Sequence, residues 1–258
     1  MIKNVFLGIK AYAGAFELIS KLKLWKYFVI PVLISVFTAI IIGVTAYGFS
    51  DDIGQFISSV WVWEWGKETF TTISEIFGGL IIIVIGLVLY KHIIMALSAP
   101  FMSPVSEKIE AHLLGEDSNL IHQHRNTSFQ EQLWRGIRIN IRNLFMELWL
   151  TVIILIISLI PVIGWFTSLL LFFIQAYYAG FGNMDYTLER HFKYQESISL
   201  VRKNRGIAIG NGIVFMLFLL IPVIGVILVL PLSVTAASTE TVRLLNAENK
   251  ANKIQSND

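Results

Sequence analysis

The stretch Leu-Ile-Pro-Val-Ile-Gly at residues 159–164 returns letter for letter at residues 220–225, a displacement of 61 residues. Each copy lies in the middle of a long apolar run. A proline and a glycine three residues apart end a helix and let the chain reverse. The repeat therefore predicts two helical hairpins, whose bends we place at Pro161, Gly164, Pro222 and Gly225.

The predicted bends are unusual because they are apolar. A turn that reaches water normally contains Asn, Asp or Ser, but between Pro161 and Trp165 the indole N–H is the sole polar side-chain group. Only 13 uncharged residues separate Glu147 from Pro161, which is roughly 20 Å of helix and short for a full crossing. We therefore expect both hairpins to be re-entrant, with bends that stay inside the membrane.

The composition excludes a soluble domain. Of the 258 residues, 55% are hydrophobic and only 15% are charged, and the mean hydropathy is +0.67. These values are typical of an integral membrane protein. The formal charge of +2 gives no reason to expect a nucleic-acid partner, and the absence of cysteine excludes disulfides and thiol catalysis. The chain also contains no nucleotide-binding, metalloprotease or hydrolase motif, so we expect neither enzymatic activity nor a cofactor.

Two apolar segments are long enough to span the bilayer. Residues 1–22 have one apolar and one charged face, which predicts a helix on the membrane surface or, alternatively, one packed on the protein's own cytosolic part. The expected all-α membrane domain consists of this interfacial helix (1–22), spanning helices at 27–49 and 76–97, cytosolic helices at 98–143, hairpin one at 144–182, a cytosolic helix at 183–205, hairpin two at 206–243 and a flexible tail at 244–258.

Three connecting segments lead to local predictions. Residues 50–75 are interpreted as an acidic loop anchored at the interface by Trp61, Trp63 and Trp65. Residues 98–104 are expected to stop the second spanning helix, with Ser103 and Pro104 starting a new one. The loop around His122 and His124 offers too few ligands for zinc, so we predict no metal site.

The positions of the basic residues predict the topology. With two crossings and two returning hairpins, 19 of the 20 Lys and Arg residues lie on one side and Lys67 lies alone on the other. Because basic residues stay on the cytosolic side, both termini and all large connectors are expected in the cytosol.

The basic residues also gather where buried helices begin. A helix start offers free N–H groups and the positive end of the dipole, so a cation beside it favours an oxyanion. The positive-inside rule would place cations at the same positions without any binding role. The candidates are Lys21, Lys23 and Lys26 before the first crossing, Arg138 and Arg142 before hairpin one, and Arg202, Lys203 and Arg205 before hairpin two. In the second hairpin, Gly206, Gly210 and Gly212 form a small-residue face that allows close helix packing.

Several short motifs follow one another along the chain in an order that is typical of one family. They are Ala99-Pro100-Phe101, Glu107-Lys108-Ile109-Glu110, Asp185-Tyr186 with Arg190 and Phe192, Arg205-Gly206-x-Ala208-x-Gly210-x-Gly212, and the prolines Pro161, Pro222 and Pro231. From about Gly8 to Arg243, the sequence resembles the CysZ sulfate-permease family, which shares its domain with the etoposide-induced membrane proteins. The resemblance implies a homo-oligomer in the bacterial inner membrane that admits sulfate, and also sulfite, for cysteine synthesis.

The resemblance also implies a binding site. The family's sulfate site lies in a Gly-Leu-Arg-Arg segment, which aligns with Lys23, Leu24, Trp25 and Lys26. Here the glycine is replaced by Lys23 and the first arginine by Trp25. A lysine binds an oxyanion as a point charge but lacks the guanidinium fork.

The leading hypothesis is therefore transport of sulfate or a related oxyanion without ATP hydrolysis, channel-like or ion-coupled, by a multi-pass membrane protein with lipid as its surroundings. The alternative is a scaffold or lipid-organising membrane protein of the same family that does not transport.

Overall fold

The computed structural model describes residues 1–59, 67–115, 125, 127–158, 164–221 and 224–255, and within these ranges the chain is helical with short turns. The elements are α1 (Ile2–Lys10), the 3-10 turn η1 (Ala11–Gly14), α2 (Ala15–Lys21), α3 (Trp25–Ser58), α4 (Lys67–Leu114), α6 (Phe129–Ser158), α7 (Gly164–Leu188), α8 (Tyr194–Lys203), α9 (Arg205–Leu219) and α10 (Ile224–Gln255).

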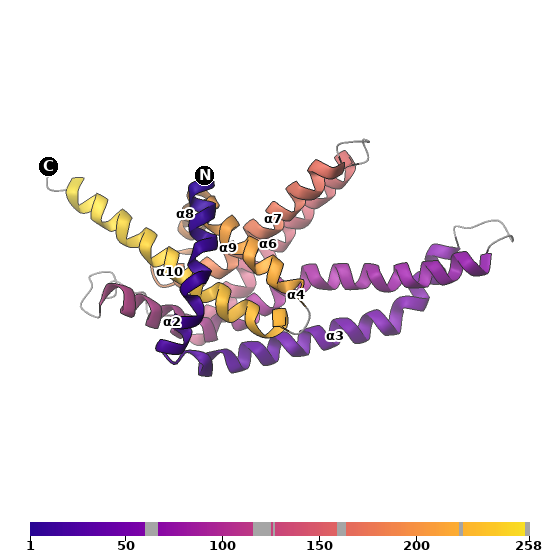
Figure 1. Cartoon of the computed structure of the whole chain (residues 1–258), viewed down its shortest axis with the longest axis horizontal. Coiled ribbons are helices and arrows are strands. Elements are labelled where there is room, and N and C mark those ends of the chain that lie inside the picture. Colours follow the sequence, from indigo (N-terminus) through magenta and orange to yellow (C-terminus); the bar gives the residue numbers. More distant parts are fainter. Residues whose placement is uncertain (60–66, 116–124, 126, 159–163, 222–223, 256–258) are drawn as a thin grey trace.

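The long helices form antiparallel pairs that extend from one shared body. Figure 1 shows α3 with α4 and α6 with α7 leaving this body in different directions, while α9 and the first part of α10 stay within it. By length and composition, four helical segments can cross a membrane: Trp25–Ser58, Lys67–Leu114, Phe129–Ser158 and Ile227–Asn249. Large apolar side chains stay exposed along the pairs, among them Phe37, Val44 and Trp149, each 66% exposed. The structure is thus that of a multi-pass membrane protein whose outer surface suits lipid.

Two predicted interruptions are wrong. The helix expected at 27–49 continues to Ser58 and the next begins at Lys67, so most of the expected loop at 50–75 is helical. Residues Trp61, Trp63 and Trp65 lie outside the described residues, as do His122 and His124.

The predicted stop at residues 98–104 is also wrong, because α4 runs through Pro100 and Pro104 to Leu114. Pro100 has no N–H to donate, so the helical hydrogen bond to the carbonyl of Ala96 is missing. That carbonyl lies against Gly136 of α6, and Ala99 is buried in the core. After Pro100, Met102 and Val105 are also buried, so packing on both sides of this proline holds the helix together where the local sequence would end it.

The close packing predicted for the glycines of α9 is confirmed, but these glycines lie on two faces of the helix rather than on one. A Cβ built at Gly206 or Gly210 would meet the backbone of α1, which approaches through Gly8. On the other side, a Cβ at Gly212 would overlap the Ala176 carbonyl of α7. Gly206 and Gly210, four residues apart, thus let α9 pack closely on α1 with one face, and Gly212 lets it pack closely on α7 with another.

The N-terminal segment packs on the rest of the protein, as one of the two interpretations of residues 1–22 predicted. Gly8 lies against α9, and the Tyr12 hydroxyl donates a hydrogen bond of 2.8 Å to the Asn211 carbonyl. Outward-facing Ile2 and Phe6 remain 73% and 66% exposed, so the same helix also offers an apolar face to its surroundings.

The end of the chain differs from the expected flexible tail. Helix α10 continues to Gln255, and Glu248 pairs with Lys203 of α8 at 3.5 Å. The first residues after Leu245 remain partly covered, so contacts with the rest of the protein support this part of the helix.

Candidate anion-binding site

The predicted sulfate-binding residues lie in the turn between α2 and α3. The Lys23 N–H donates to the Ser20 carbonyl at 3.2 Å, and the Leu24 N–H donates to the Ile19 carbonyl at 2.9 Å. These two bonds form a Schellman motif, in which the residue after the helix end takes a left-handed conformation. That residue is Lys23, with φ of 53°. Because Ile19 and Leu24 are fully buried, the turn is firmly anchored and Lys23 is left exposed at its tip. We call residues 22–26 the lysine turn.

The conformation of Lys23 leads to a stability prediction. Among the described residues it is the sole non-glycine with positive φ, and the left-handed region costs an L-residue about 1 kcal/mol. Lys23→Gly should therefore raise the unfolding free energy by about 0.5 to 1 kcal/mol, measured by thermal unfolding in detergent. Lys26→Gly, inside the first turn of α3, should lower it by a similar amount. Equal destabilisation by both changes would contradict the assigned turn.

Trp25 acts as an anchor in the position where the family has an arginine. Its ring makes edge contacts with Phe16 at 5.6 Å and Phe28 at 6.5 Å between centroids. No side chain caps the start of α3 at Leu24, so the first N–H groups of this 34-residue helix have no side-chain acceptor there. The substitution removes one cation but keeps the helix start accessible.

A third lysine joins the site from α4. The ammonium groups of Lys26 and Lys108 lie 5.2 Å and 6.0 Å from the centre of the same Tyr27 ring. Both side chains are exposed. Sequence reasoning missed Lys108 because its nearness to Lys26 depends on how α4 packs beside α3, which no local pattern encodes. The structure therefore places two cations on one ring and Lys23 in the same turn as Lys26.

The basic residues at the hairpin starts fall into separate groups. The Tyr177 hydroxyl lies within the electrostatic reach of half-buried Arg142 and exposed Arg202 and Arg205. The basic residues at the starts of both hairpins thus lie near one tyrosine. Arg138 instead stacks on Tyr194 at 4.2 Å, and Lys203 pairs with Glu248.

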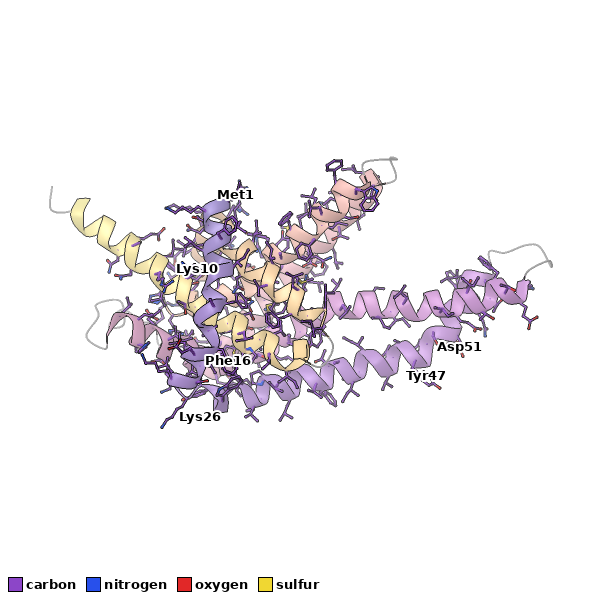
Figure 2. The ribbon with its side chains drawn as sticks, in the orientation of Figure 1. Met1, Lys10, Phe16, Lys26, Tyr47 and Asp51 are labelled. Carbon is purple, nitrogen blue, oxygen red and sulfur yellow. The ribbon has the colours of Figure 1, made fainter. Side chains whose placement is uncertain are left out.

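The lysine turn and the hairpin starts lie apart. Met1 packs against Gly206, next to Arg205, and Figure 2 shows Met1 and Lys26 at opposite ends of the N-terminal segment. The predicted basic residues therefore form more than one site. Of the predicted bends, Gly164 and Gly225 lie at or near the starts of α7 and α10, and Gly225 packs against the Phe218 backbone. Pro161 and Pro222 lie outside the described residues.

A buried ionic cluster joins α4 to α6. The Lys91 ammonium donates to Glu147 Oε1 at 2.7 Å, and His92 Nε2 lies 3.2 Å from Glu147 Oε2. Lys91 and Glu147 are each 1% exposed. Sequence reasoning missed this cluster. The signal that could have found it is a lone glutamate at the start of an apolar run, since a charge there requires a partner.

A second network joins the ends of α4 and α7. Arg190 donates to Glu110 Oε2 at 3.0 Å and to the Ser103 carbonyl at 3.1 Å. Arg135 of α6 makes two bonds to Asp185, at 3.0 Å and 2.8 Å. Three residues that carry the family resemblance, Glu110, Asp185 and Arg190, thus hold these helices in register through charged hydrogen bonds.

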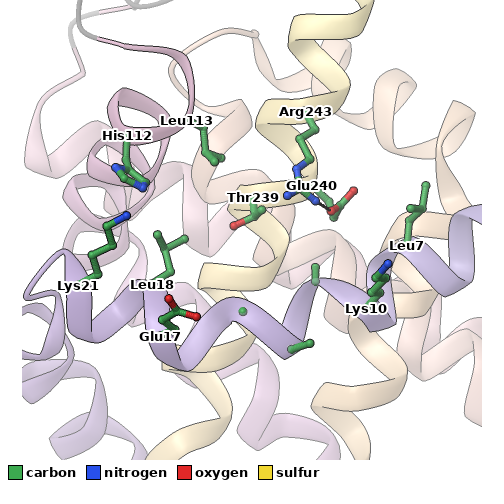
Figure 3. Close-up of a pocket in the computed structure, with 13 residues that line it drawn as sticks. Leu7, Lys10, Glu17, Leu18, Lys21, His112, Leu113, Thr239, Glu240 and Arg243 are labelled. Atoms are coloured by element: carbon green, nitrogen blue, oxygen red, sulfur yellow. Dashed lines mark hydrogen bonds and ion pairs between the residues drawn. The ribbon is translucent and has the colours of Figure 1, made fainter.

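A cavity of about 510 Å³ lies under the N-terminal segment. Figure 3 shows Lys10, Glu17 and Lys21 on one wall, His112 from the end of α4, and Glu240 with Arg243 from α10. Arg243 and Glu240 form an ion pair, which offsets part of the positive charge. The cavity therefore has mixed charge, with Lys21 linking it to the lysine turn. No group of three or more potential metal ligands occurs in the described part of the chain.

The molecule is a helical multi-pass membrane protein with exposed cations at helix starts and buried ion pairs between its helices. It matches the family described as "Sulfate transporter CysZ/Etoposide-induced protein 2.4" over residues 11–230, and the chain belongs to that family. A comparison with curated proteins gave no match.

Proposed function

We propose that this protein carries sulfate, and also sulfite, across the bacterial inner membrane into the cytosol, where it supplies cysteine synthesis. The observation that carries the proposal is the lysine turn: Lys23 and Lys26 lie on either side of the uncapped first residue of α3, and Lys108 shares the Tyr27 ring with Lys26. Ammonium groups and free helical N–H groups together favour a tetrahedral oxyanion. Membership of a family that includes the sulfate transporter CysZ is consistent with this substrate class.

The proposed topology has two spanning helices, α3 and α4, and two re-entrant hairpins with both termini in the cytosol. Helix α9 has 15 residues, about 22 Å against a hydrocarbon core of about 30 Å. Phe218 and Leu219 at its end share a packed cluster with Ala39 and Ile42, which lie near the middle of α3. The short length of α9 and the packing of its end in the same cluster as the middle of α3 support a hairpin that turns back inside the membrane.

In the proposed topology the lysine turn lies on the cytosolic face. An anion that enters the cell is therefore released from this turn, and an anion that leaves the cell is captured by it. The exposed lysines attract the dianion as point charges. Because they cannot form the bidentate hydrogen bonds of arginine, the bound anion can dissociate readily. Transport without ATP hydrolysis fits the lack of a phosphate-binding loop in the sequence. A homo-oligomer, implied by the family resemblance, forms part of the proposal.

Sulfate flux into liposomes that contain the purified protein tests the site. Lys26→Ala/Lys108→Ala removes both cations from the Tyr27 ring and should lower the initial rate about tenfold, the loss expected for one charged hydrogen bond of about 1.5 kcal/mol. The matched control, Lys3→Ala/Lys67→Ala, removes two exposed lysines elsewhere and should transport at the wild-type rate. An unchanged rate in the first variant would favour the scaffold hypothesis or a different route for the anion.

A further inference from the structure

A pocket of about 200 Å³ lies beside the first turns of α6, and the residues that line it do not belong to the lysine turn. Its walls come from three parts of the chain: the segment before α6, the first turns of α6, and the connection from α7 to α8. The residues used below are Arg125, Glu131, Trp134, Arg138, Glu189 and Lys193.

The pocket presents cations that have no carboxylate partner. No ion pair within the described ranges neutralises Arg138 or Lys193, and both side chains are exposed. Arg138 is held by stacking on Tyr194 at 4.2 Å, while Arg125 donates to the Phe192 carbonyl at 3.1 Å. Stacking fixes the guanidinium plane and leaves its N–H groups able to donate to a ligand.

The pocket also contains an unsatisfied carboxyl group. Glu189 is only 2% exposed, and its Oε1 is buried with no hydrogen-bond partner. An unpaired buried oxygen is costly, so a ligand that supplies a partner gains affinity. Burial raises the pKa of Glu189 to about 7, with Asp185 adding to this rise while a hydrogen bond from Ser103 and the charges of Arg190 and Arg135 oppose it.

We propose that this pocket is a second oxyanion site, in which Arg138 and Lys193 bind a small tetrahedral dianion and Glu189, in its neutral form, donates a hydrogen bond to it. The ligand class is free sulfate or phosphate. A dianion beside Glu189 favours the protonated carboxyl group, and by reciprocity the protonated carboxyl group favours the dianion. Binding therefore takes up one proton, which moves from solvent to Glu189.

The other charges that face Glu189 are already compensated. Arg135 is paired with Asp185, and Arg190 is paired with Glu110. Glu131 at the pocket rim receives hydrogen bonds from Ser128 and is exposed. Glu189 is thus the buried carboxyl group in the pocket whose protonation remains open to control by a ligand.

Calorimetric titration with sodium sulfate tests the proposal. It uses the full chain in detergent with Lys23→Ala/Lys26→Ala, so that the lysine turn does not contribute and failure of the transport proposal leaves the result unaffected. With one linked proton, the Kd should rise about tenfold from about pH 6 to about pH 8. Glu189→Gln, which keeps a neutral donor, should bind with nearly the same Kd at both pH values. The matched control Glu131→Gln should retain the tenfold change.

One further variant and a comparison of ligands complete the test. Arg138→Gln should weaken sulfate binding about tenfold at about pH 6 while thermal unfolding stays unchanged, because the side chain is exposed. A pH-independent Kd in the parent protein, or the same pH dependence in Glu189→Gln, would overturn the proposal. Saturation by short-chain phosphatidic acid, with none by sulfate or inorganic phosphate, would identify a lipid headgroup as the ligand and overturn the assignment to a free anion.

Discussion

Gly212→Val should prevent the protein from reaching its folded state. A Cβ at Gly212 would overlap the carbonyl oxygen of Ala176, and a Cβ at Gly180, one turn along α7, would overlap the carbonyl of Ala208. Both obstacles are backbone atoms of a packed helix, so no side-chain rotation relieves them. We expect a loss of more than about 3 kcal/mol, because valine adds three carbon atoms where even one does not fit.

The measurement is the yield of monodisperse protein on size-exclusion chromatography, together with the midpoint of thermal unfolding. Gly43→Val is the matched control, because a Cβ at Gly43 on α3 meets nothing within 4 Å. This control should express and unfold as the wild type does. Normal yield from Gly212→Val would mean that α7 and α9 do not cross at these residues.

The second large effect is expected at the buried ion pair. Glu147→Ala leaves the Lys91 ammonium, which is 1% exposed, without its partner at 2.7 Å. An uncompensated buried charge costs about 3 to 5 kcal/mol. Thermal unfolding of this variant should show that loss, and Lys91→Met/Glu147→Leu, which removes both charges, should recover most of it.

The pair Lys203 and Glu248 provides the control. Its atoms are 3.5 Å apart, and Lys203 is 75% exposed, so Glu248→Ala should cost less than about 1 kcal/mol. If Glu147→Ala were as mild as Glu248→Ala, Lys91 would have access to water or lipid headgroups, and the α4–α6 contact would be looser than described.

The sequence predicted the membrane class, the family and close packing through the glycines of α9, because each depends on local pattern, although it placed these glycines on one face instead of two. Apolar runs and the repeat at residues 159–164 and 220–225 need no knowledge of packing. The repeat relates Arg142 to Lys203, 61 residues later, but in the structure Lys203 pairs with Glu248, and Arg202 and Arg205 lie near Tyr177 together with Arg142.

Other features were beyond sequence reasoning for a physical reason. Pro100 and Pro104 looked like helix breakers, and tertiary packing against Gly136 overrides that local preference. Lys108 near Lys26 and Glu147 near Lys91 are pairs from different helices. Their meeting depends on helix rotation and crossing, and a single sequence contains no direct record of either.

The turn at Lys23 explains one position in the alignment with the family. The family's glycine aligns with the residue that has a left-handed conformation here, so that glycine has a backbone role that is separate from anion binding. The departure from the family pattern thus costs stability at Lys23 and removes a cation at Trp25, while Lys26 and Lys108 keep positive charge at the helix start.

The central claim is that the protein carries sulfate, and its most direct test is the uptake of radiolabelled sulfate by liposomes that hold the purified protein. Sulfite, phosphate and chloride are compared as competitors, and protein-free liposomes of the same lipid give the background. The account predicts sulfate uptake well above background, with sulfite competing more strongly than chloride. Uptake no faster than in protein-free liposomes would contradict it.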